Sequence, residues 1–374
     1  MEKQRKKLTE LCDIQYGYSF DSAKFTNDDI YIPLVRIRDV KRGYSETFYM
    51  GEYQEEYVLH EGDLLIGMDG EFNIARWKSR EALLNQRVCR IIAKEKTDEE
   101  YLRFYLVKAL KEIEARTSFA TVKHLSAKEL NKLELDIPEY WKQKEISQSL
   151  RVIERLIELR KKELEELDNL IKSRFVELFG GLERTTTIAR YISELRGGKS
   201  LAGTEPCKNK VLKTGAATFG WFNPEQYKYL PTDYEPLPEH KVEKGDVIIS
   251  RMNTPELVGA CSYVFDAPED MYYPDRLWKA VLQDNTNPIF LWQLLWDSDI
   301  RKAVKEKSSG TSGTMNNISK PNLLAIKCMD VPIELQNEYA EFVNQIDKLK
   351  VNKIAARWPA KAVAQFFYSF KNRQ

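Results

Sequence analysis

The sequence predicts two mixed α/β (α+β) domains in tandem, separated by long helices that form an antiparallel coiled coil, with an internal pseudo-two-fold repeat relating the halves. Two observations lead to this fold class. Apolar residues recur at every seventh position in 143–179 and again after Pro332, and a helix with such a seam needs a partner helix to bury it. Four short markers also recur in the same order in both halves, which indicates a duplicated module.

The length of 374 residues leaves room for two or three domains with sizeable cores. We expect four segments: a first globular domain at 1–142, a central spacer helix at 143–181, a second globular domain at 182–330, and a distal spacer helix at 331–374. A helix over 143–179 would span about 55 Å at ~1.5 Å per residue.

The first globular domain contains segments with strand-like and helix-like patterns. Ile30–Val40 alternates as a strand does, Tyr57–Gly67 suits a strand, a Gly-Asp turn and a second strand, and Asn85–Ala93 is an apolar strand. Glu99–Arg116 places apolar residues on one helical face, and Leu133–Ile137 predicts a short strand before the spacer helix.

The second half repeats this order at an offset that grows slowly from 183 to 194 residues, as insertions in loops would make it grow. The four matched pairs are Gly62-Asp63 with Gly245-Asp246, Gln86-Arg87-Val88 with Asp275-Arg276-Leu277, TVKHLSAKEL at 121–130 with TMNNISKPNL at 314–323, and Pro138 with Pro332. Each marker alone is weak, and their shared order carries the inference.

The two heptad tracts define the expected coiled-coil seam. In the central tract it comprises Ile146, Leu150, Ile153, Ile157, Leu164, Leu167, Ile171 and Leu178. In the distal tract it comprises Phe342, Ile346, Leu349, Val363, Phe367 and Phe370, and we expect a kink at Pro359. Two alternatives stay open: the central helix is a solvated helix of one globular domain, or each tract pairs with another chain.

Sequence motifs for catalysis are missing. The nearest string to the Asn/Asp-Pro-Pro-aromatic tetrad of adenine methyltransferases is Asn223-Pro224-Glu225-Gln226, which we interpret as a turn. There is no GxxxxGK(S/T) phosphate loop, and the three histidines do not have metal-ligand spacing. We therefore expect no catalytic, cofactor-binding or metal-binding residue in this chain.

Cysteine spacing and hydropathy bear on the compartment. The five cysteines form no CxxC pair, which suits buried thiols in a reducing compartment. No run of about 18 apolar residues is present, so we expect no membrane span and a cytoplasmic protein.

Surface chemistry suited to DNA remains. The net charge of +1 excludes a polycation, so phosphate contacts must come from local clusters of Lys and Arg, and base contacts from Arg, Lys, Asn and Gln. For any single residue a solvated charge is the alternative. The candidates in the first half are Tyr18, Arg36, Arg38, Lys41, Arg42, Arg76, Lys78, Arg80, Lys123 and His124. Those in the second half are Arg196, Lys199, Lys208, Lys210, Lys213, Arg251, Asn253, Asn316, Asn317 and Lys320.

The whole pattern resembles the specificity (S) subunit of type I restriction–modification systems. The resemblance rests on KLTELCDIQYG, on the EGDLLIG and KGDVIIS turns, on the SSGTSGTMNNIS loop, on the two (I/V)P…Q entries into long helices, and on ELDNLIKSRFVELFG. It implies a non-catalytic subunit whose two target-recognition domains read the halves of a bipartite, asymmetric site in double-stranded DNA. It also implies coils that set the spacing and bind two adenine-methyltransferase subunits, which carry S-adenosylmethionine. A motor–nuclease subunit with ATP and Mg would join them.

Two rival classes make different expectations. A self-contained methyltransferase or nuclease would methylate or cleave DNA as the purified chain alone. A coiled-coil scaffold that binds only protein would show no salt-dependent duplex binding, even with partners present.

Overall fold

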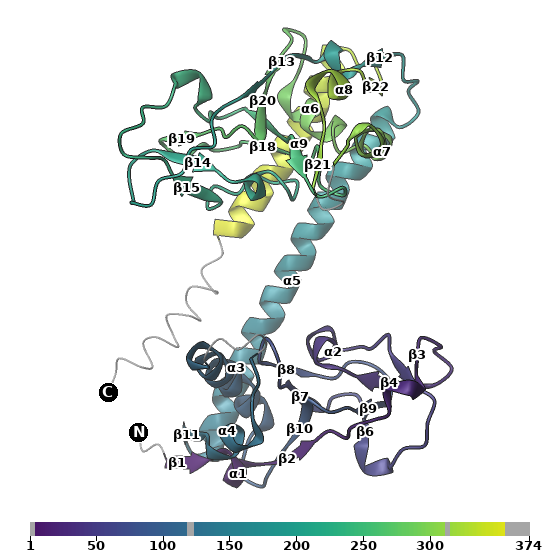
Figure 1. Ribbon diagram of the computed structural model, residues 1–374, viewed down its shortest axis with the longest axis vertical. Helices are drawn as coiled ribbons and strands as arrows, with labels where there is room; N and C mark the ends of the chain where they lie inside the picture. The colour runs from purple at the N-terminus through teal and green to yellow at the C-terminus, as the bar shows by residue number, and fades with distance from the viewer. Residues whose placement is uncertain (1–3, 118–122, 311–314, 356–374) are drawn as a thin grey trace. The chain divides into compact units, whose positions relative to one another are not determined.

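The computed structural model describes residues 4–117, 123–310 and 315–355, with side chains described as far as residue 350 (Figure 1). It divides into two compact units, Met1–Glu158 and Leu159–Gln374, which we call unit 1 and unit 2. The division falls inside the helix α5 (Tyr140–Phe179), so each unit contains part of this helix. The expected kink at Pro359 and the expected seam residues Val363, Phe367 and Phe370 lie outside the described residues.

Unit 1 is built on a four-stranded antiparallel sheet of order β2-β10-β7-β8. These strands are β2 (Cys12–Tyr16), β10 (Val88–Ala93), β7 (Leu64–Gly67) and β8 (Asn73–Arg76). The helix α3 (Glu99–Arg116) begins and ends where the apolar spacing predicted, with Asp98 as its N-cap. Its buried face, which includes Leu102, Leu106 and Leu110, joins one core with the strand residues Ile66 and Ile91.

Shorter elements complete unit 1. A five-stranded sheet has the order β3-β5-β4-β9-β6, formed by β3 (Phe25–Thr26), β5 (Phe48–Tyr49), β4 (Ile32–Val35), β9 (Ala82–Leu84) and β6 (Val58–Leu59). A two-stranded sheet pairs β1 (Gln4–Lys7) with β11 (Glu134–Ile137). The remaining helices are α1 (Leu8–Leu11), η1 (Ser22–Lys24), α2 (Ile37–Arg42), η2 (Glu55–Tyr57) and α4 (Ala127–Lys132).

One strand prediction in unit 1 was wrong in its second half. The strand expected over Ile30–Val40 ends at Val35, and α2 follows it. The Asp39 carboxylate accepts the Arg36 backbone N–H at 2.9 Å, so it caps the start of the helix. This local capping bond overrides the apolar alternation that favoured a strand.

The ion pairs at the start of α3 predict an acid-sensitive unit 1. Burial raises the pKa of Glu100, but hydrogen bonds and ion pairs with Arg76 and Arg103 outweigh burial and hold this pKa below its ordinary value of 4.5. A lowered pKa in the folded state gives stability that is complete above pH 4.5 and is lost as the pH falls through the folded-state pKa. We expect Glu100→Gln to flatten the acid limb of the unfolding free energy of unit 1, measured by chemical denaturation from pH 7 to pH 3. An unchanged acid limb would contradict this assignment.

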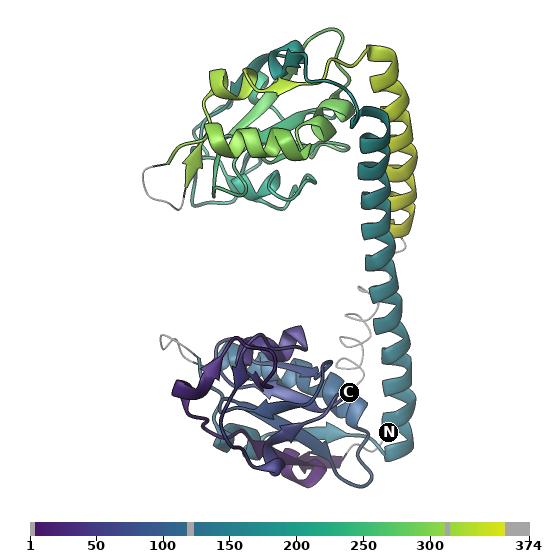
Figure 2. The ribbon, with the colours of Figure 1, turned by 90° about the vertical axis from the view of Figure 1, so that its right-hand side faces the viewer.

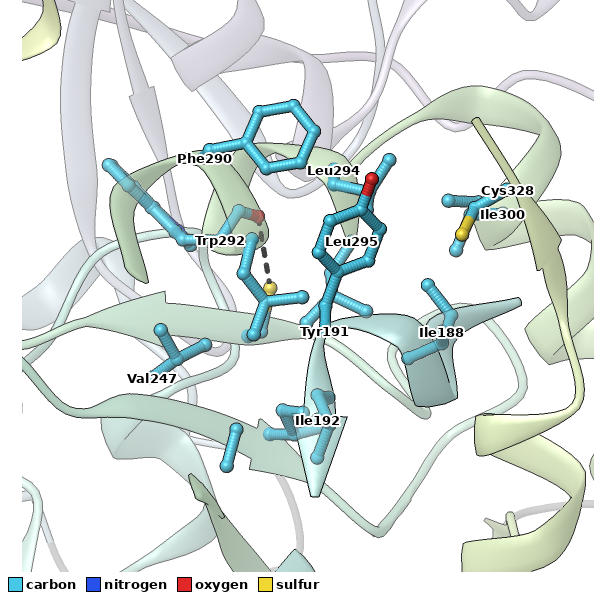
Figure 3. Close-up of a cluster of buried hydrophobic side chains, with 14 of the residues drawn as sticks. Ile188, Tyr191, Ile192, Val247, Phe290, Trp292, Leu294, Leu295, Ile300 and Cys328 are labelled. Atoms are coloured by element: carbon cyan, nitrogen blue, oxygen red, sulfur yellow. Dashed lines mark hydrogen bonds between the residues drawn. The ribbon is translucent and has the colours of Figure 1, made fainter. Parts of the chain in front are cut away.

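Unit 2 is built on an antiparallel sheet with the corresponding strand order, β13-β20-β16-β18. Its strands are β13 (Ile192–Gly197), β20 (Leu277–Leu282), β16 (Val247–Ser250) and β18 (Cys261–Tyr263). The helix α6 (Pro288–Leu294) is buried along much of its length and contributes Phe290, Trp292 and Leu294 to the core drawn in Figure 3. In that core the Cys261 thiol donates to the Trp292 carbonyl at 3.5 Å.

Shorter elements also complete unit 2. A three-stranded sheet has the order β15-β14-β19, formed by β15 (Tyr227–Tyr229), β14 (Lys210–Leu212) and β19 (Met271–Tyr272). Two-stranded sheets pair β12 (Thr186–Thr187) with β22 (Lys327–Cys328), and β17 (Met252–Asn253) with β21 (Asn316–Asn317). The remaining helices are η3 (Ile188–Arg190), η4 (Thr214–Ala216), η5 (Pro238–His240), α7 (Ser298–Lys307) and α8 (Lys320–Leu324).

Within unit 2 the helix α9 (Ile333–Ala355) runs antiparallel to the carboxyl-terminal part of α5 (Figure 2). The Tyr339 hydroxyl donates to the Ile171 carbonyl at 3.2 Å, and Lys350 forms an ion pair with Asp168. The earlier residue of α9, Tyr339, contacts the later residue of α5, Ile171, and Lys350 contacts the earlier Asp168, so the two helices run in opposite directions. In the distal tract the predicted seam residue Leu349 is 49% exposed, whereas Tyr339, Val343 and Ile346 are buried. The 3.6-residue period carries this buried face to position 350 rather than 349.

The predicted central seam is buried unevenly. Leu150 and Ile171 are buried, and Ile146, Ile153, Ile157, Leu164, Leu167 and Leu178 are half-buried. Phe175 and Phe179, which the strict seven-residue spacing did not select, are 5% and 0% exposed. Their rings lie 5.0 Å apart between centroids, and both contact Tyr339 of α9. The end of α5 is therefore part of the core of unit 2.

The Gly-Asp turns have the same geometry in both units. Gly62 and Gly245 have φ of +98° and +94°, a left-handed conformation that favours glycine. Asp63 accepts the His60 N–H at 2.9 Å and pairs with Arg90 at 3.0 Å. In unit 2, Asp246 accepts the Glu243 N–H at 2.8 Å and pairs with Lys279 at 2.8 Å.

A buried glutamine near the start of each long helix is a second matched feature. Gln143 accepts the Asp98 N–H at 2.9 Å and donates to the Pro138 carbonyl at 2.9 Å. Gln336 accepts the Asn287 N–H at 2.9 Å and donates to the Val331 carbonyl at 2.8 Å. Asp98 and Asn287 are the N-caps of α3 and α6, so each glutamine connects a long helix to the start of one helix of its globular part.

The cysteines are free thiols: Cys12, Cys89, Cys261 and Cys328 are buried, and Cys207 is half-buried. Burial raises the pKa of Cys12 and of Cys328 to about 12. Among the described residues, no helix is both long enough and apolar enough to cross a bilayer.

Candidate nucleic-acid interface

In unit 1, four chain segments meet at the edge of the sheet where β2 ends and β10 begins. The loop edge of unit 1 comprises Gly17-Tyr18, Met68-Asp69, Gln86-Arg87 and Lys123-His124. Backbone bonds join these segments: Gln86 N donates to Tyr18 O at 2.8 Å, Met68 N to Arg87 O at 2.9 Å, and Gly70 N to Lys123 O at 2.8 Å. Asp69 and His124 form an isolated antiparallel bridge. The edge is thus a bonded framework rather than a set of independent loops.

Three charged or polar side chains contact one another on this loop edge. The Asp69 carboxylate lies 2.5 Å from His124 Nδ1, and Arg87 Nη1 lies 3.1 Å from His124 Nε2. Arg87 Nε lies 3.7 Å from Asp69 Oδ2. The side chains of Arg87 and His124 are 52% and 44% exposed, so both face solvent. Tyr18 is also exposed, and its ring packs against Phe20 and Tyr57.

The predicted basic residues around α2 form a separate group. Arg38 donates to the Thr47 hydroxyl at 3.3 Å, and Arg42 pairs with Glu46 at 3.6 Å, while Arg36 is exposed at the N-cap. Lys41 lies 3.4 Å from Glu71, which also pairs with Lys111 of α3 at 3.0 Å. Hydrogen bonding to Lys111, together with the charge of both lysines, lowers the pKa of Glu71.

The third predicted group, Arg76, Lys78 and Arg80, has mainly structural contacts. Arg76 pairs with Glu99 at 2.8 Å, and it lies opposite Leu64, at the end of β7 away from Asp69. Arg80 donates to the Asp29 carbonyl at 2.5 Å and to the Tyr31 carbonyl at 3.1 Å. Lys78 is exposed and covers Gly43. The structure does not bring Arg76 to the loop edge.

The same framework recurs in unit 2. The loop edge of unit 2 comprises 197–199, 251–253, 275–276 and 316–317. Arg251 N donates to Arg276 O at 3.0 Å, as Met68 N does to Arg87 O. Ile318 N donates to Arg251 O at 3.1 Å, as Leu125 N does to Met68 O at 2.7 Å, and Gly198 N donates to Pro274 O at 3.0 Å, as Tyr18 N does to Leu84 O at 3.0 Å. Met252 pairs with Asn317, just as Asp69 pairs with His124 in unit 1.

The side chains on the loop edge of unit 2 are different. Arg251 Nε donates to Asn317 Oδ1 at 3.2 Å, and its guanidinium lies 5.9 Å from the centroid of the Trp278 ring. Asn253 donates to the Thr218 hydroxyl at 3.3 Å, and Asn316 donates to the Ser308 hydroxyl at 3.0 Å. Lys199 lies 5.9 Å from the Tyr234 ring centroid. The framework is shared, and the groups it presents are not.

The other predicted residues of unit 2 lie apart or are paired. Arg196 pairs with Glu194 at 2.7 Å on β13, and Lys320 is exposed at the start of α8. Lys208, Lys210 and Lys213 belong to or flank β14 in the three-stranded sheet. Lys208 pairs with Asp270 at 3.6 Å, and Lys210 Nζ lies 4.8 Å from the Tyr227 ring centroid.

Sequence reasoning missed Asp69, Arg87 and Arg276 as candidates. The signal was present, because Gln86-Arg87-Val88 and Asp275-Arg276-Leu277 were two of the repeat markers. Because this marker recurs in both halves and contains an arginine, Arg87 and Arg276 could have been predicted as DNA-contacting residues. Asp69 had no such signal, since a carboxylate is not an obvious group for contacting DNA.

The loop edges offer exposed hydrogen-bond donors and acceptors on rigid backbones. Among the described residues, no cluster of His, Cys, Asp or Glu has the arrangement that holds a metal ion. Guanidinium, amide and imidazole groups suit contacts with base edges and phosphates.

Comparison with known proteins finds a family for the first part of the chain and a known fold for the whole chain. Residues 1–169 match the family described as type I restriction modification DNA specificity domain. The chain is accordingly similar to specificity subunits of type I restriction–modification systems, which confirms the resemblance seen in the sequence motifs.

Three relatives illustrate the extent of the similarity. The EcoBI specificity subunit of Escherichia coli is 37% identical over 166 residues, which are 44% of this chain and only 35% of that subunit. The EcoKI specificity subunit of Escherichia coli K12 is 20% identical over 355 residues, covering 86% of this chain and 76% of that subunit. The crystal structure of a type I S subunit from M. genitalium aligns with a TM-score of 0.57 at 14% identity, covering 98% and 95% of the two chains, and supports the fold.

Proposed function

We propose that this chain is a non-catalytic, sequence-specific DNA-binding specificity subunit of a type I restriction–modification complex. Unit 1 and unit 2 read the two halves of a bipartite, asymmetric site, and their loop edges carry the reading side chains. The observation that carries this proposal is that one backbone framework recurs at both loop edges and presents different side chains, Arg87 and His124 in one, Arg251 and Asn317 in the other. Two half-sites of different sequence would require this combination.

The long helices α5 and α9 would act as the spacer between the half-sites. We propose that they pair as an antiparallel coiled coil over their full tracts, within a pseudo-two-fold arrangement of the modules. The contacts of Tyr339 and Lys350 with α5 support this pairing. In this proposal the coil also docks two adenine-methyltransferase subunits, which bring S-adenosylmethionine. ATP and Mg belong to a motor–nuclease subunit, and the complex acts in the cytoplasm.

A seven-residue insertion in the spacer tests the proposal. Inserting one heptad after Glu158, where the side chains of residues 158–160 are exposed, adds about 10 Å of helix and leaves the helical phase nearly unchanged. We expect the gap between half-sites to grow by about three base pairs, given ~3.4 Å per base pair, while each half-site sequence is kept. Genome-wide mapping of methylated adenines, in cells that express the chain with its methyltransferase, reads both quantities at once.

Two outcomes would count against the spacer. One is an altered half-site sequence with the original gap, and the other is a wild-type gap in an active complex. A coiled-coil scaffold without DNA readout is the competing function. It predicts no salt-dependent duplex binding by the chain with its partners, whereas neutralising several phosphates gives a steep fall of affinity with salt.

A further inference from the structure

The arginines held at the two loop edges have a specific task within the proposed function. We infer that Arg87 reads a guanine in the half-site of unit 1 and that Arg251 reads a guanine in the half-site of unit 2. His124 and Asn317 are then positioning residues that aim these guanidinium groups. This inference rests on the proposed function and goes beyond it by naming the reading side chains and the base.

The backbone holds Arg87 in an unusual and rigid position. Its φ is +71°, in the left-handed region that non-glycine residues rarely adopt. Neighbouring backbone bonds keep it there: Gln86 N to Tyr18 O at 2.8 Å, Val88 N to Asn85 O at 3.2 Å, and Met68 N to Arg87 O at 2.9 Å. A strained residue at an exposed edge, held from both sides, is a feature of functional sites.

The side chains of Asp69 and His124 together orient the Arg87 guanidinium. The Asp69 carboxylate is an acceptor, so His124 Nδ1 donates its proton to Asp69, a tautomer assigned from this contact. In neutral His124 the second ring nitrogen, Nε2, then accepts from Arg87 Nη1 at 3.1 Å. Within the described part of the chain, no hydrogen bond engages Arg87 Nη2, which leaves this donor for an outside acceptor.

In unit 2 a different pair of residues, Asn317 and Arg251, makes the corresponding contact. Asn317 occupies the strand position that corresponds to His124, and its carbonyl oxygen accepts from Arg251 Nε at 3.2 Å. Arg251 corresponds to Met68 rather than to Arg87, because both donate their backbone N–H to the arginine before β20 or β10. The residue paired with the segment after β7 or β16, His124 or Asn317, therefore orients an arginine in each unit, and that arginine comes from a different segment.

Guanine fits these groups better than the other bases. It offers two acceptors, N7 and O6, in the major groove, and the guanidinium fork matches both at once. Because the two arginines project from different segments, the readout predicts a guanine at a different place in each half-site.

Selection of duplexes from a randomised library, by the full chain bound to its methyltransferase, tests the inference. Arg87→Gly suits the left-handed backbone and is expected to fold. We expect it to weaken the preference for guanine at one position of the first half-site by about tenfold or more, the order expected for losing a bidentate arginine–guanine pair. The second half-site should stay unchanged. Arg251→Ala should give the mirror result, and Arg87→Lys should keep affinity but lose much of the preference, because lysine lacks the planar fork.

Variants of His124 distinguish a role in orienting the Arg87 guanidinium from a role in packing alone. His124→Ala should reduce the guanine preference, and His124→Gln should restore part of it, because the amide oxygen again accepts from Arg87. Lys96→Ala is the matched control: Lys96 is an exposed cation with φ of +65° that follows the opposite end of β10, so its loss should alter neither half-site.

The outcomes distinguish this inference from the proposed function. If the wild-type chain selects a bipartite site and Arg87→Gly selects the same bases, the guanine assignment is wrong and the proposed function stands. An equal loss of affinity for all sequences would make Arg87 a phosphate contact and would also overturn the inference. If the wild-type chain with its methyltransferase selects no sequence, the proposed function fails.

Discussion

Replacement of Gln336 with leucine is expected to destabilise unit 2 by about 2–5 kcal/mol. Gln336 is fully buried, accepts the Asn287 N–H at 2.9 Å, and donates to the carbonyls of Val331 and Asn285. Leucine fills nearly the same volume but satisfies none of these groups, and each buried group left unpaired costs about 1–3 kcal/mol. Denaturant unfolding, followed by probes in each unit, measures the change.

The corresponding change in unit 1, Gln143→Leu, should act in the same way on unit 1 alone. Its amide accepts the Asp98 N–H and donates to Pro138 O, both at 2.9 Å. The matched controls are Gln148→Leu on α5 and Gln345→Leu on α9, because both of these glutamines are exposed on the same helices. If the buried and exposed replacements have equal effects, the glutamines do not join the helices to the globular parts as described.

These substitutions also bear on the proposed spacing of half-sites. Each glutamine bonds the start of a long helix to the N-cap of α3 or α6, so its loss should loosen the globular part on its helix. In the proposed function, variants that still fold should accept a wider range of gaps with unchanged half-sites. Methylation mapping reads this range, and an unchanged gap in a destabilised variant would separate stability from spacing.

Phe179→Ala is expected to have the second large effect, about 3–5 kcal/mol on the unfolding of unit 2. Phe179 is fully buried, and its ring centroid lies 5.0 Å from Phe175, 5.2 Å from Phe290 and 5.6 Å from Tyr339. The substitution leaves a cavity where α5, α6 and α9 meet. Unit 1 should unfold as before, because this core belongs to unit 2.

A neighbouring residue supplies the control for this cavity. Val176 lies one turn earlier on α5 and is 65% exposed, so Val176→Ala removes apolar atoms from the same helix without opening a cavity. We expect a change within about 0.5 kcal/mol. A small effect of Phe179→Ala, or a parallel loss in unit 1, would show that the end of α5 is not an essential part of the core of unit 2.

Local periodicity explains which elements the sequence could predict. The helix α3 was predicted at its observed ends because its apolar face and Asp98 cap are local signals. The residues Arg36–Arg42 fit a strand and a helix equally well. The hydrogen bond from the Arg36 N–H to the Asp39 carboxylate selects the helix. Phe175 and Phe179 were missed because a helix that enters a globular core buries a wider face than a strict heptad seam.

The candidate site shows a similar limit. Two of the four repeat markers, Gln86-Arg87-Val88 with Asp275-Arg276-Leu277 and 121–130 with 314–323, contain residues of the loop edges, whereas no marker contained Gly17-Tyr18 or Met68-Asp69. The contacts among Asp69, Arg87 and His124 join residues 37 and 55 positions apart, and no local pattern encodes them. Arg76 looked free in the sequence, although Glu99 and Glu100 neutralise it in the structure.

The exposed middle of α5 has a consequence for recombination within the gene that encodes this chain. Residues 158–160 are exposed, and the boundary between the two units falls at Glu158 and Leu159. A recombination event at this point would transfer an intact core on either side and would cut through no buried contact of these three side chains. Crossovers there can therefore create hybrid proteins with a new pairing of globular units, whereas crossovers near Phe179 would have to rebuild a core.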